Sequence, residues 1–162
     1  MGKVSHPGQP IRRRISDLAG QSVGTDRACH QGMRPEEGAL RVLVVDDEAL
    51  IRWAVTETLT RAGHDVLQAS DARSALRALA DAGRALDVAL LDLRLPDSSD
   101  LTLLSRIRVL LPDCAVVLMS AHVSAEVAAE ARAMGAFDVL PKPFDLDGCE
   151  QTLRQARSAI RH

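Results

Sequence analysis

The sequence predicts one α/β domain of (βα)₅ type, with five parallel strands in a doubly wound sheet. Two observations favour this fold. Short apolar runs alternate with segments of helical periodicity from Leu40 onward. The runs are almost continuously apolar, as is typical of parallel strands that are buried on both faces. Right-handed crossovers between such strands favour an open sheet of the flavodoxin-like type.

Each expected element has a local cause. The first helix has Ile51, Val55 and Leu59 at four-residue spacing and ends at Gly63, which is typical of a helix C-terminus. Asp71 can N-cap the second helix. The expected strands are 41–45, 66–69, 86–91, 115–119 and 137–140, and the expected helices are 48–62, about 72–79, about 101–111, 125–134 and about 146–160.

The first 39 residues have a different composition. They hold six of the ten glycines, no aromatic residue and a basic cluster at 12–14. Such a segment buries too little apolar surface to offset its ordering entropy, so we expect residues 1–39 to be a disordered tail that folding does not need. A short amphipathic turn near 11–19 is the alternative. Since only 20 residues follow Lys142, we expect a domain at 40–162 and no second domain.

Composition argues against several classes of function. A net charge of −2 gives no electrostatic reason to expect binding to nucleic acid or an anionic membrane. Aromatic residues are 2% of the chain, too few for a base-stacking surface. No apolar stretch approaches the ~20 residues of a membrane span. Cys29, Cys114 and Cys149 lack metal-ligand spacing, so we expect reduced thiols and a cytoplasmic location.

Four of the five apolar runs end in chemically reactive side chains. Asp46-Asp47 follow the first run, Asp92 the third, Ser120 the fourth and Lys142 the fifth. In an open parallel sheet the carboxyl ends of the strands line one crevice, so these residues should meet there. Carboxylates suit Mg²⁺, and a hydroxyl and an amine suit phosphoryl oxygens. An exposed, ionised Asp92 could attack phosphorus and hold an acyl phosphate.

Each of these residues also has a structural explanation. Asp46-Asp47 could cap the following helix, Asp92 could be a turn residue, and Ser120 alone indicates little. Lys142 is more informative, because the chain has 18 arginines but only two lysines. A compact ammonium is not interchangeable with a planar guanidinium. Taken together at four strand ends, the residues favour a site over separate structural roles.

Four segments carry a family resemblance: VVDDE at 44–48, LLDLRLPD at 90–97, LMSAH at 118–122 and GAFDVLPKPF at 135–144. In this order they resemble the receiver domain of two-component response regulators, over about 41–160. The segments at 51–53, 121–122 and 141–145 look most like receivers of NtrC-type activators. The likeness implies a phosphorylation-controlled binding module, here a stand-alone one, and not a conventional enzyme.

The resemblance also implies roles for individual residues. Asp92 would accept a phosphoryl group from a sensor histidine kinase or a phosphotransfer protein. Mg²⁺ would be held by Asp46, Asp47, Asp92 and the backbone carbonyl of Arg94. Ser120 and Lys142 would bind phosphoryl oxygens, and the Lys142–Pro143 bond would be cis. A downstream protein would bind at the fourth helix, fifth strand and fifth helix.

Three departures from the family pattern stand out. Val139 occupies a position that is usually aromatic, and Asp100 a position that is usually glycine. The ATPase and DNA-binding segments of NtrC-type activators are absent from these 162 residues, so direct nucleic-acid binding is not expected. Two other interpretations stay open: a small aspartyl-phosphate phosphatase, which usually has Asp-x-Asp at the first strand end, and a receiver-like scaffold that is never phosphorylated.

Overall fold

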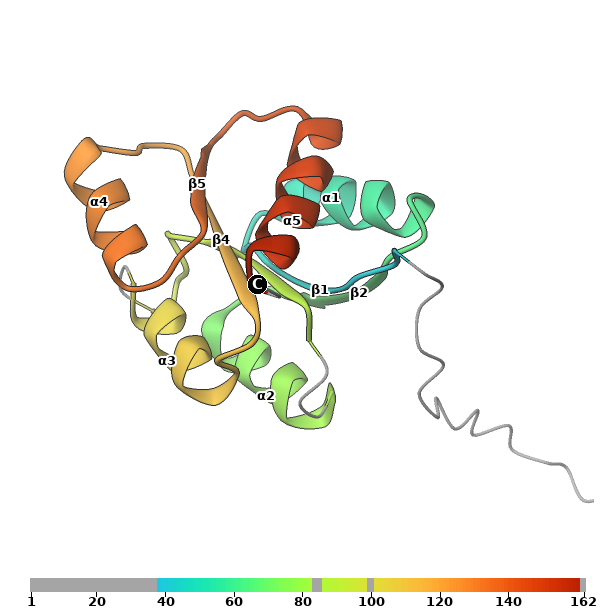
Figure 1. The fold of residues 1–162 in the computed structure, drawn as a ribbon, viewed down its shortest axis with the longest axis horizontal. Coiled ribbons are helices and arrows are strands. Elements are labelled where there is room, and N and C mark those ends of the chain that lie inside the picture. The colour runs from blue at the N-terminus through green and yellow to red at the C-terminus, as the bar shows by residue number, and fades with distance from the viewer. Residues whose placement is uncertain (1–37, 83–85, 99–100, 161–162) are drawn as a thin grey trace, which may run out of the picture. The chain divides into compact units, whose positions relative to one another are not determined.

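A computed structural model describes residues 38–82, 86–98 and 101–160, which form five strands alternating with five helices (Figure 1). Every predicted element is present, and most ends agree within two residues. The strands are β1 (Arg41–Val45), β2 (Asp65–Ala69), β3 (Val88–Asp92), β4 (Ala115–Ser120) and β5 (Asp138–Pro141). The helices are α1 (Ala49–Arg61), α2 (Ala72–Ala82), α3 (Thr102–Leu110), α4 (Ala125–Ala133) and α5 (Leu146–Ile160).

The strand order is β2-β1-β3-β4-β5, and every neighbouring pair is parallel. This order confirms the predicted doubly wound, flavodoxin-like sheet. β1 lies between β2 and β3, so the chain changes its winding direction there. The register aligns Val45 with Leu91, Asp92 with Met119 and Ser120 with Pro141. The predicted site residues therefore lie at one edge of the sheet, around the switch point between β1 and β3.

Both faces of the sheet are buried, as the continuous apolar strands predicted. On one face, strand residues such as Leu43 and Leu91 pack in one apolar cluster with α2, α3 and α4. On the other, Val44 and Leu90 pack with α1 and α5, which lie together in Figure 1. Among the described residues, no helix combines the length and the apolar character that crossing a lipid bilayer requires.

Side chains and glycines fix the helix ends. Asp71 caps α2 as predicted, because its Oδ1 accepts a hydrogen bond from the Ser74 amide at 2.6 Å. Asp97, from the segment after β3, accepts hydrogen bonds from the amides of Ala72 and Arg73 in the same helix, at 2.7 and 2.9 Å. Gly63 and Gly135 follow α1 and α4 with φ of 87° and 95°, the left-handed backbone that glycine adopts without strain.

Several sequence-based expectations fall outside the described residues. The tail expected at 1–39 lies almost entirely in 1–37, and Cys29 and Asp100 are likewise not described. The other two cysteines, Cys114 and Cys149, are free and buried. Burial raises the pKa of each of these two thiols to about 12, so both are protonated at neutral pH.

His64 joins three parts of the domain through a ring that is fully buried. Its Nδ1 accepts a hydrogen bond from the Leu40 amide at 2.9 Å, immediately before β1. Because Nδ1 is an acceptor, the ring proton lies on Nε2, which donates to Glu150 of α5 at 3.0 Å. The ring therefore ties the entry of β1 and the turn before β2 to the last helix.

We predict that His64→Leu lowers the free energy of unfolding by about 2 kcal/mol, because it leaves the buried Leu40 amide without an acceptor. His64→Gln keeps an acceptor oxygen and should recover part of that loss. Urea unfolding followed by circular dichroism measures both variants. Equal losses for the two variants would show that packing, and not the hydrogen bond, accounts for the effect.

Candidate functional site

Lys142 connects the ends of three strands at the carboxyl edge of the sheet. Its Nζ lies 2.8 Å from Asp46 Oδ2 and 2.6 Å from Asp92 Oδ2, and 3.4 Å from Glu48 Oε1. The side chains of Lys142, Asp46 and Asp92 are 8%, 0% and 6% exposed. Three of the residues predicted from sequence thus form one buried network of charges. The predicted cis bond between Lys142 and Pro143 is confirmed.

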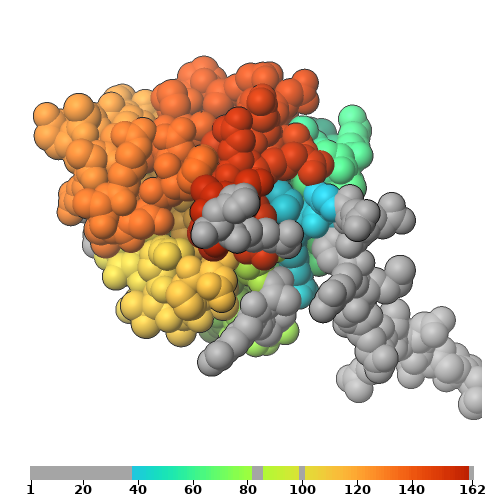
Figure 2. Space-filling view, in the orientation of Figure 1, coloured from blue at the N-terminus to red at the C-terminus, as the bar shows by residue number. Residues whose placement is uncertain are grey.

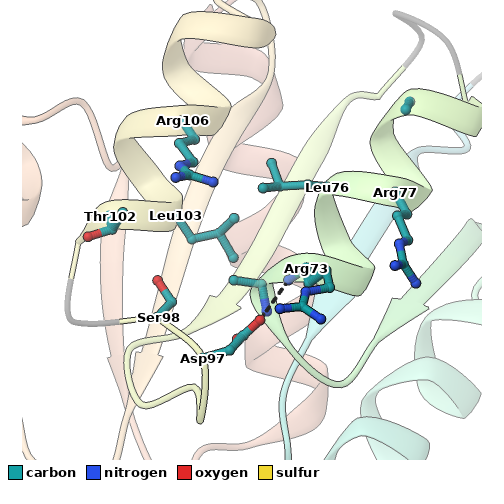
Figure 3. A pocket seen from close by; sticks show the side chains of 10 residues that line it. Arg73, Leu76, Arg77, Asp97, Ser98, Thr102, Leu103 and Arg106 are labelled. Carbon is teal, nitrogen blue, oxygen red and sulfur yellow. Dashed lines mark hydrogen bonds between the residues drawn. The ribbon is translucent and has the colours of Figure 1, made fainter.

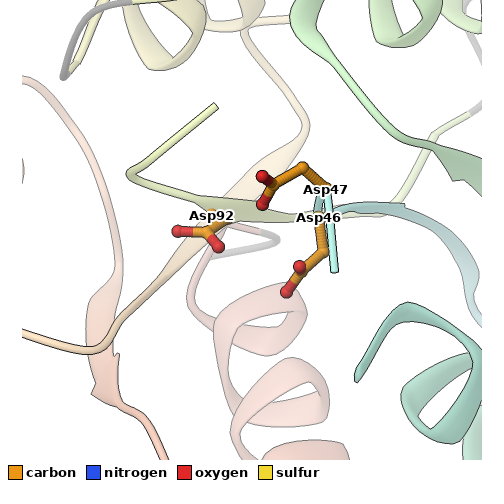
Figure 4. Close-up of side chains that lie close together, drawn as sticks. All are labelled: Asp46, Asp47 and Asp92. Atoms are coloured by element: carbon orange, nitrogen blue, oxygen red, sulfur yellow. The ribbon is translucent and has the colours of Figure 1, made fainter. Parts of the chain in front are cut away.

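Three carboxylates converge beside this lysine. Asp46 and Asp47 follow β1 and Asp92 ends β3, and one oxygen from each lies within 4.8 Å of the others (Figure 4). Asp47 is exposed, whereas the other two are buried. Hard oxygen donors gathered at this spacing, with one open side, fit a Mg²⁺ ion that keeps part of its water shell. The residues present therefore suit the predicted divalent cation.

Backbone amides orient the two buried carboxylates. Asp46 Oδ1 accepts a hydrogen bond from the Glu48 amide at 2.8 Å, and Asp92 Oδ1 accepts one from the Arg94 amide at 2.9 Å. Each carboxylate oxygen has a second lone pair for another partner. Glu48 is the N-cap residue of α1 and its side chain makes no capping bond, so neither aspartate is itself the N-cap residue.

Opposite charges in the network stabilise one another. Burial raises the pKa of Asp46 above its ordinary value of 3.8, although hydrogen bonds from Lys142 and the Glu48 amide oppose the rise. Burial of Lys142 alone would lower its pKa. Its hydrogen bonds and its attraction to Asp46 and Asp92 outweigh that effect and raise the pKa to about 12. The ammonium is therefore charged at any physiological pH.

Ser120 ends β4 and lies at the same edge, but its hydroxyl is engaged within its own loop. Its Oγ donates to the His122 carbonyl at 2.9 Å and accepts from the His122 amide at 3.2 Å. The Ser120 carbonyl accepts a hydrogen bond from the Lys142 amide at 2.7 Å, which continues the pairing of β4 with β5. Ser120 therefore connects the site to the loop that leads into α4.

Sequence reasoning did not assign roles to Glu48 and Arg52. Glu48 supplies a third carboxylate to Lys142, and Arg52 Nη1 donates to the Asp46 carbonyl at 2.6 Å. Both residues lie in segments that the resemblance includes, at 44–48 and 51–53. Their position in the first turn after the acidic pair is the only local signal.

Val139 is buried on the α4 side of the sheet, in the cluster that contains Ala128 and Ala131.

A five-stranded parallel sheet with three aspartates and a lysine at its switch point defines a doubly wound α/β domain with an acidic, lysine-bridged crevice. Comparison with protein families specifies the class further. The model of the response regulator receiver domain matches residues 42–154, so the chain belongs to this family of two-component signalling proteins.

Individual relatives agree with this assignment. The chain is 40% identical over 121 residues to the DNA-binding transcriptional regulator NtrC of Proteus hauseri, an alignment covering 75% of this chain and 24% of that protein. It is 40% identical over 108 residues to NtrC of Azospirillum brasilense, covering 67% and 22%. The chain thus spans about a quarter of the length of the curated relatives it matches.

Solved structures give the same result. NtrX from Brucella abortus, in complex with ATP, has a TM-score of 0.70 and 38% identity, over 76% of this chain and 28% of that one. A response regulator receiver domain protein from Clostridium thermocellum also has a TM-score of 0.70, with 28% identity over 75% of this chain and 97% of that one. The latter match covers almost a whole receiver domain.

We predict that Lys142→Met destabilises the metal-free domain by about 3 kcal/mol at neutral pH, because it leaves buried carboxylates without their counter-ion. Since the pKa of Asp46 is raised in the folded state, the unfolded chain ionises first, and stability falls as pH rises above the ordinary value of 3.8. The stability that Lys142→Met loses at neutral pH should therefore be regained as the pH falls toward ~4.

Thermal unfolding in EDTA at several pH values tests this prediction. Arg61→Met, which removes an exposed cation from a surface pair on α1, is the control and should change stability little at any pH. A loss for Lys142→Met that is the same at pH ~4 and ~7 would contradict the proposed charge balance.

Proposed function

We propose that this receiver domain accepts a phosphoryl group on Asp92 from the phosphohistidine of a cytoplasmic sensor histidine kinase or phosphotransfer protein. The observation that carries the proposal is the position of Asp92. It ends the central strand β3 within the acidic cluster, and its Oδ2 lies 2.6 Å from the Lys142 ammonium. A cationic partner at this distance can balance the charge of an incoming phosphoryl group.

The chemistry is a displacement at phosphorus. A carboxylate oxygen of Asp92 forms a P–O bond while the P–N bond to the donor imidazole breaks, and the released imidazole nitrogen takes up a proton. We infer that Asp46, Asp47, Asp92 and the Arg94 backbone carbonyl would hold Mg²⁺, which would neutralise charge on the transferred group. The domain acts on its own side chain and, under this proposal, turns over no separate substrate.

Lys142 and Ser120 have different starting positions for binding the phosphoryl oxygens. Lys142 already contacts Asp92, so its ammonium needs little movement. Ser120 would have to exchange its hydrogen bond to the His122 carbonyl for one to a phosphoryl oxygen. That exchange would release the loop between β4 and α4, and it gives phosphorylation a direct route to the fourth helix.

The proposed output is binding of a downstream protein at α4, β5 and α5. Figure 2 shows these elements, orange to red, as one continuous surface. Phe137, immediately before β5, is 37% exposed and is an aromatic side chain that a partner could cover. DNA binding belongs, by name, to the longer NtrC proteins.

We predict that acetyl phosphate adds one phosphoryl group to the domain in the presence of Mg²⁺, and none in EDTA, because the cation offsets repulsion between the anion and the acidic cluster. Asp92→Asn should abolish the adduct in intact mass spectra. Asp81→Asn, which alters an exposed carboxylate on α2, is the matched control and should leave labelling unchanged. Labelling of Asp92→Asn at the wild-type level would refute the assignment.

A second prediction concerns the strength of the switch. Val139 is too short and too stiff at χ1 to report a change as an aromatic side chain would. With beryllofluoride as phosphoryl mimic, amide exchange should therefore change most in the 121–124 loop and α4, and much less in α5. Exchange changes in α5 as large as those in the loop would show that coupling does not depend on the loop alone.

A further inference from the structure

A groove of about 560 Å³ lies between α2 and α3, among residues that do not belong to the acidic crevice (Figure 3). Its floor is apolar. Leu76 of α2 and Leu103 of α3 face one another across it, and Ala72 and Ala80 extend the apolar strip one turn to either side of Leu76. Ala72, Leu76 and Ala80 recur every four residues, so at 1.5 Å per residue the strip is about 12 Å long.

The rim of the groove is cationic. Arg73 and Arg77 on α2 and Arg106 on α3 line it, and all three are exposed. Within the described part of the chain, none of these guanidiniums forms an ion pair with a carboxylate. By contrast, Arg61 is paired with Glu57 at 2.9 Å, and Arg132 with Asp138 at 2.8 Å. Among the described residues, no carboxylate lies within ion-pair distance of these three guanidiniums, although the charge of Arg73 acts on Asp71.

Asp97 is the one acidic residue among the described lining residues, so its single charge stands against three guanidiniums. Both of its carboxylate oxygens accept hydrogen bonds from backbone amides, at Ala72 and Arg73, at the start of α2. The positive end of the helix dipole adds to these bonds. The described lining thus carries three guanidiniums and one carboxylate around an apolar floor.

We propose that this groove binds an acidic amphipathic helix of a protein partner. An apolar strip just over two turns long matches side chains at positions i, i+4 and i+7 of an incoming helix. Guanidiniums on both rims can pair in bidentate fashion with glutamate or aspartate beside that strip. The described lining residues include no aromatic side chain for stacking bases, which disfavours a nucleic acid as occupant.

This surface is separate from the proposed output face at α4, β5 and α5. It is complete in the structure without a phosphoryl group, so its binding does not depend on Asp92 chemistry. Failure of the groove proposal and failure of the phosphotransfer proposal are consequently distinguishable, since Asp92→Asn should leave binding in the groove unchanged.

Fluorescence anisotropy with the full chain tests the proposal. The probe is a stapled helical peptide with leucines at i, i+4 and i+7 and flanking glutamates. Arg77→Gln/Arg106→Gln should weaken its binding about fivefold, because two rim ion pairs are lost. Arg61→Gln/Arg132→Gln removes the same charge from α1 and α4 and should leave binding within about twofold. Leu76→Ser should also weaken binding, because it removes an apolar contact from the floor of the groove.

Three outcomes would overturn the proposal: no binding below ~1 mM, equal weakening by the two double variants, or unchanged binding by Leu76→Ser. The first shows that the groove has no such affinity, and the second that only net charge matters. The third shows that the apolar floor does not contribute. If ATP also displaces the peptide, the groove is a site for small anions instead. Thermal unfolding of each variant establishes that differences in binding do not arise from loss of the fold.

Discussion

The structure depends on one buried cation at the carboxyl edge of the sheet. Lys142 follows β5, yet it contacts carboxylates at the ends of β1 and β3, on the far side of β4. Without it, the acidic residues at the switch point would repel one another, and burial already disfavours the charged form of Asp46. The site is therefore complete only when β5 is paired with β4, because Lys142 follows β5.

The segment after β3 connects this site to the rest of the molecule. Asp92 belongs to the charge network, and Asp97, five residues later, caps the helix that forms one wall of the cationic groove. Across the crevice, Ser120 is bonded to the loop before α4. Two short loops thus carry site residues at one end and helix contacts at the other. The crevice and the two helices are therefore joined by short stretches of chain.

Local sequence patterns were sufficient for the fold, because uninterrupted apolar runs and four-residue spacing directly reflect burial of strands and helices. They also placed Asp46, Asp92 and Lys142 together, since parallel strands share a carboxyl edge. Three features could not be read from the chain: the engagement of the Ser120 hydroxyl with His122, the contact of Glu48 with Lys142, and the capping of α2 by Asp97. Each depends on a side-chain direction set by neighbours that the sequence does not identify.

The strand order leaves β2 and β5 as the edges of the sheet, and both are poor templates for another strand. β5 has four residues and ends in Pro141, which has no amide hydrogen to donate. β2 exposes the polar Asp65 and Gln68. Association by adding a strand to either edge is therefore disfavoured. Contacts with other proteins would therefore be made through side chains and not through backbone pairing, on surfaces whose charge and shape can change without remaking the sheet.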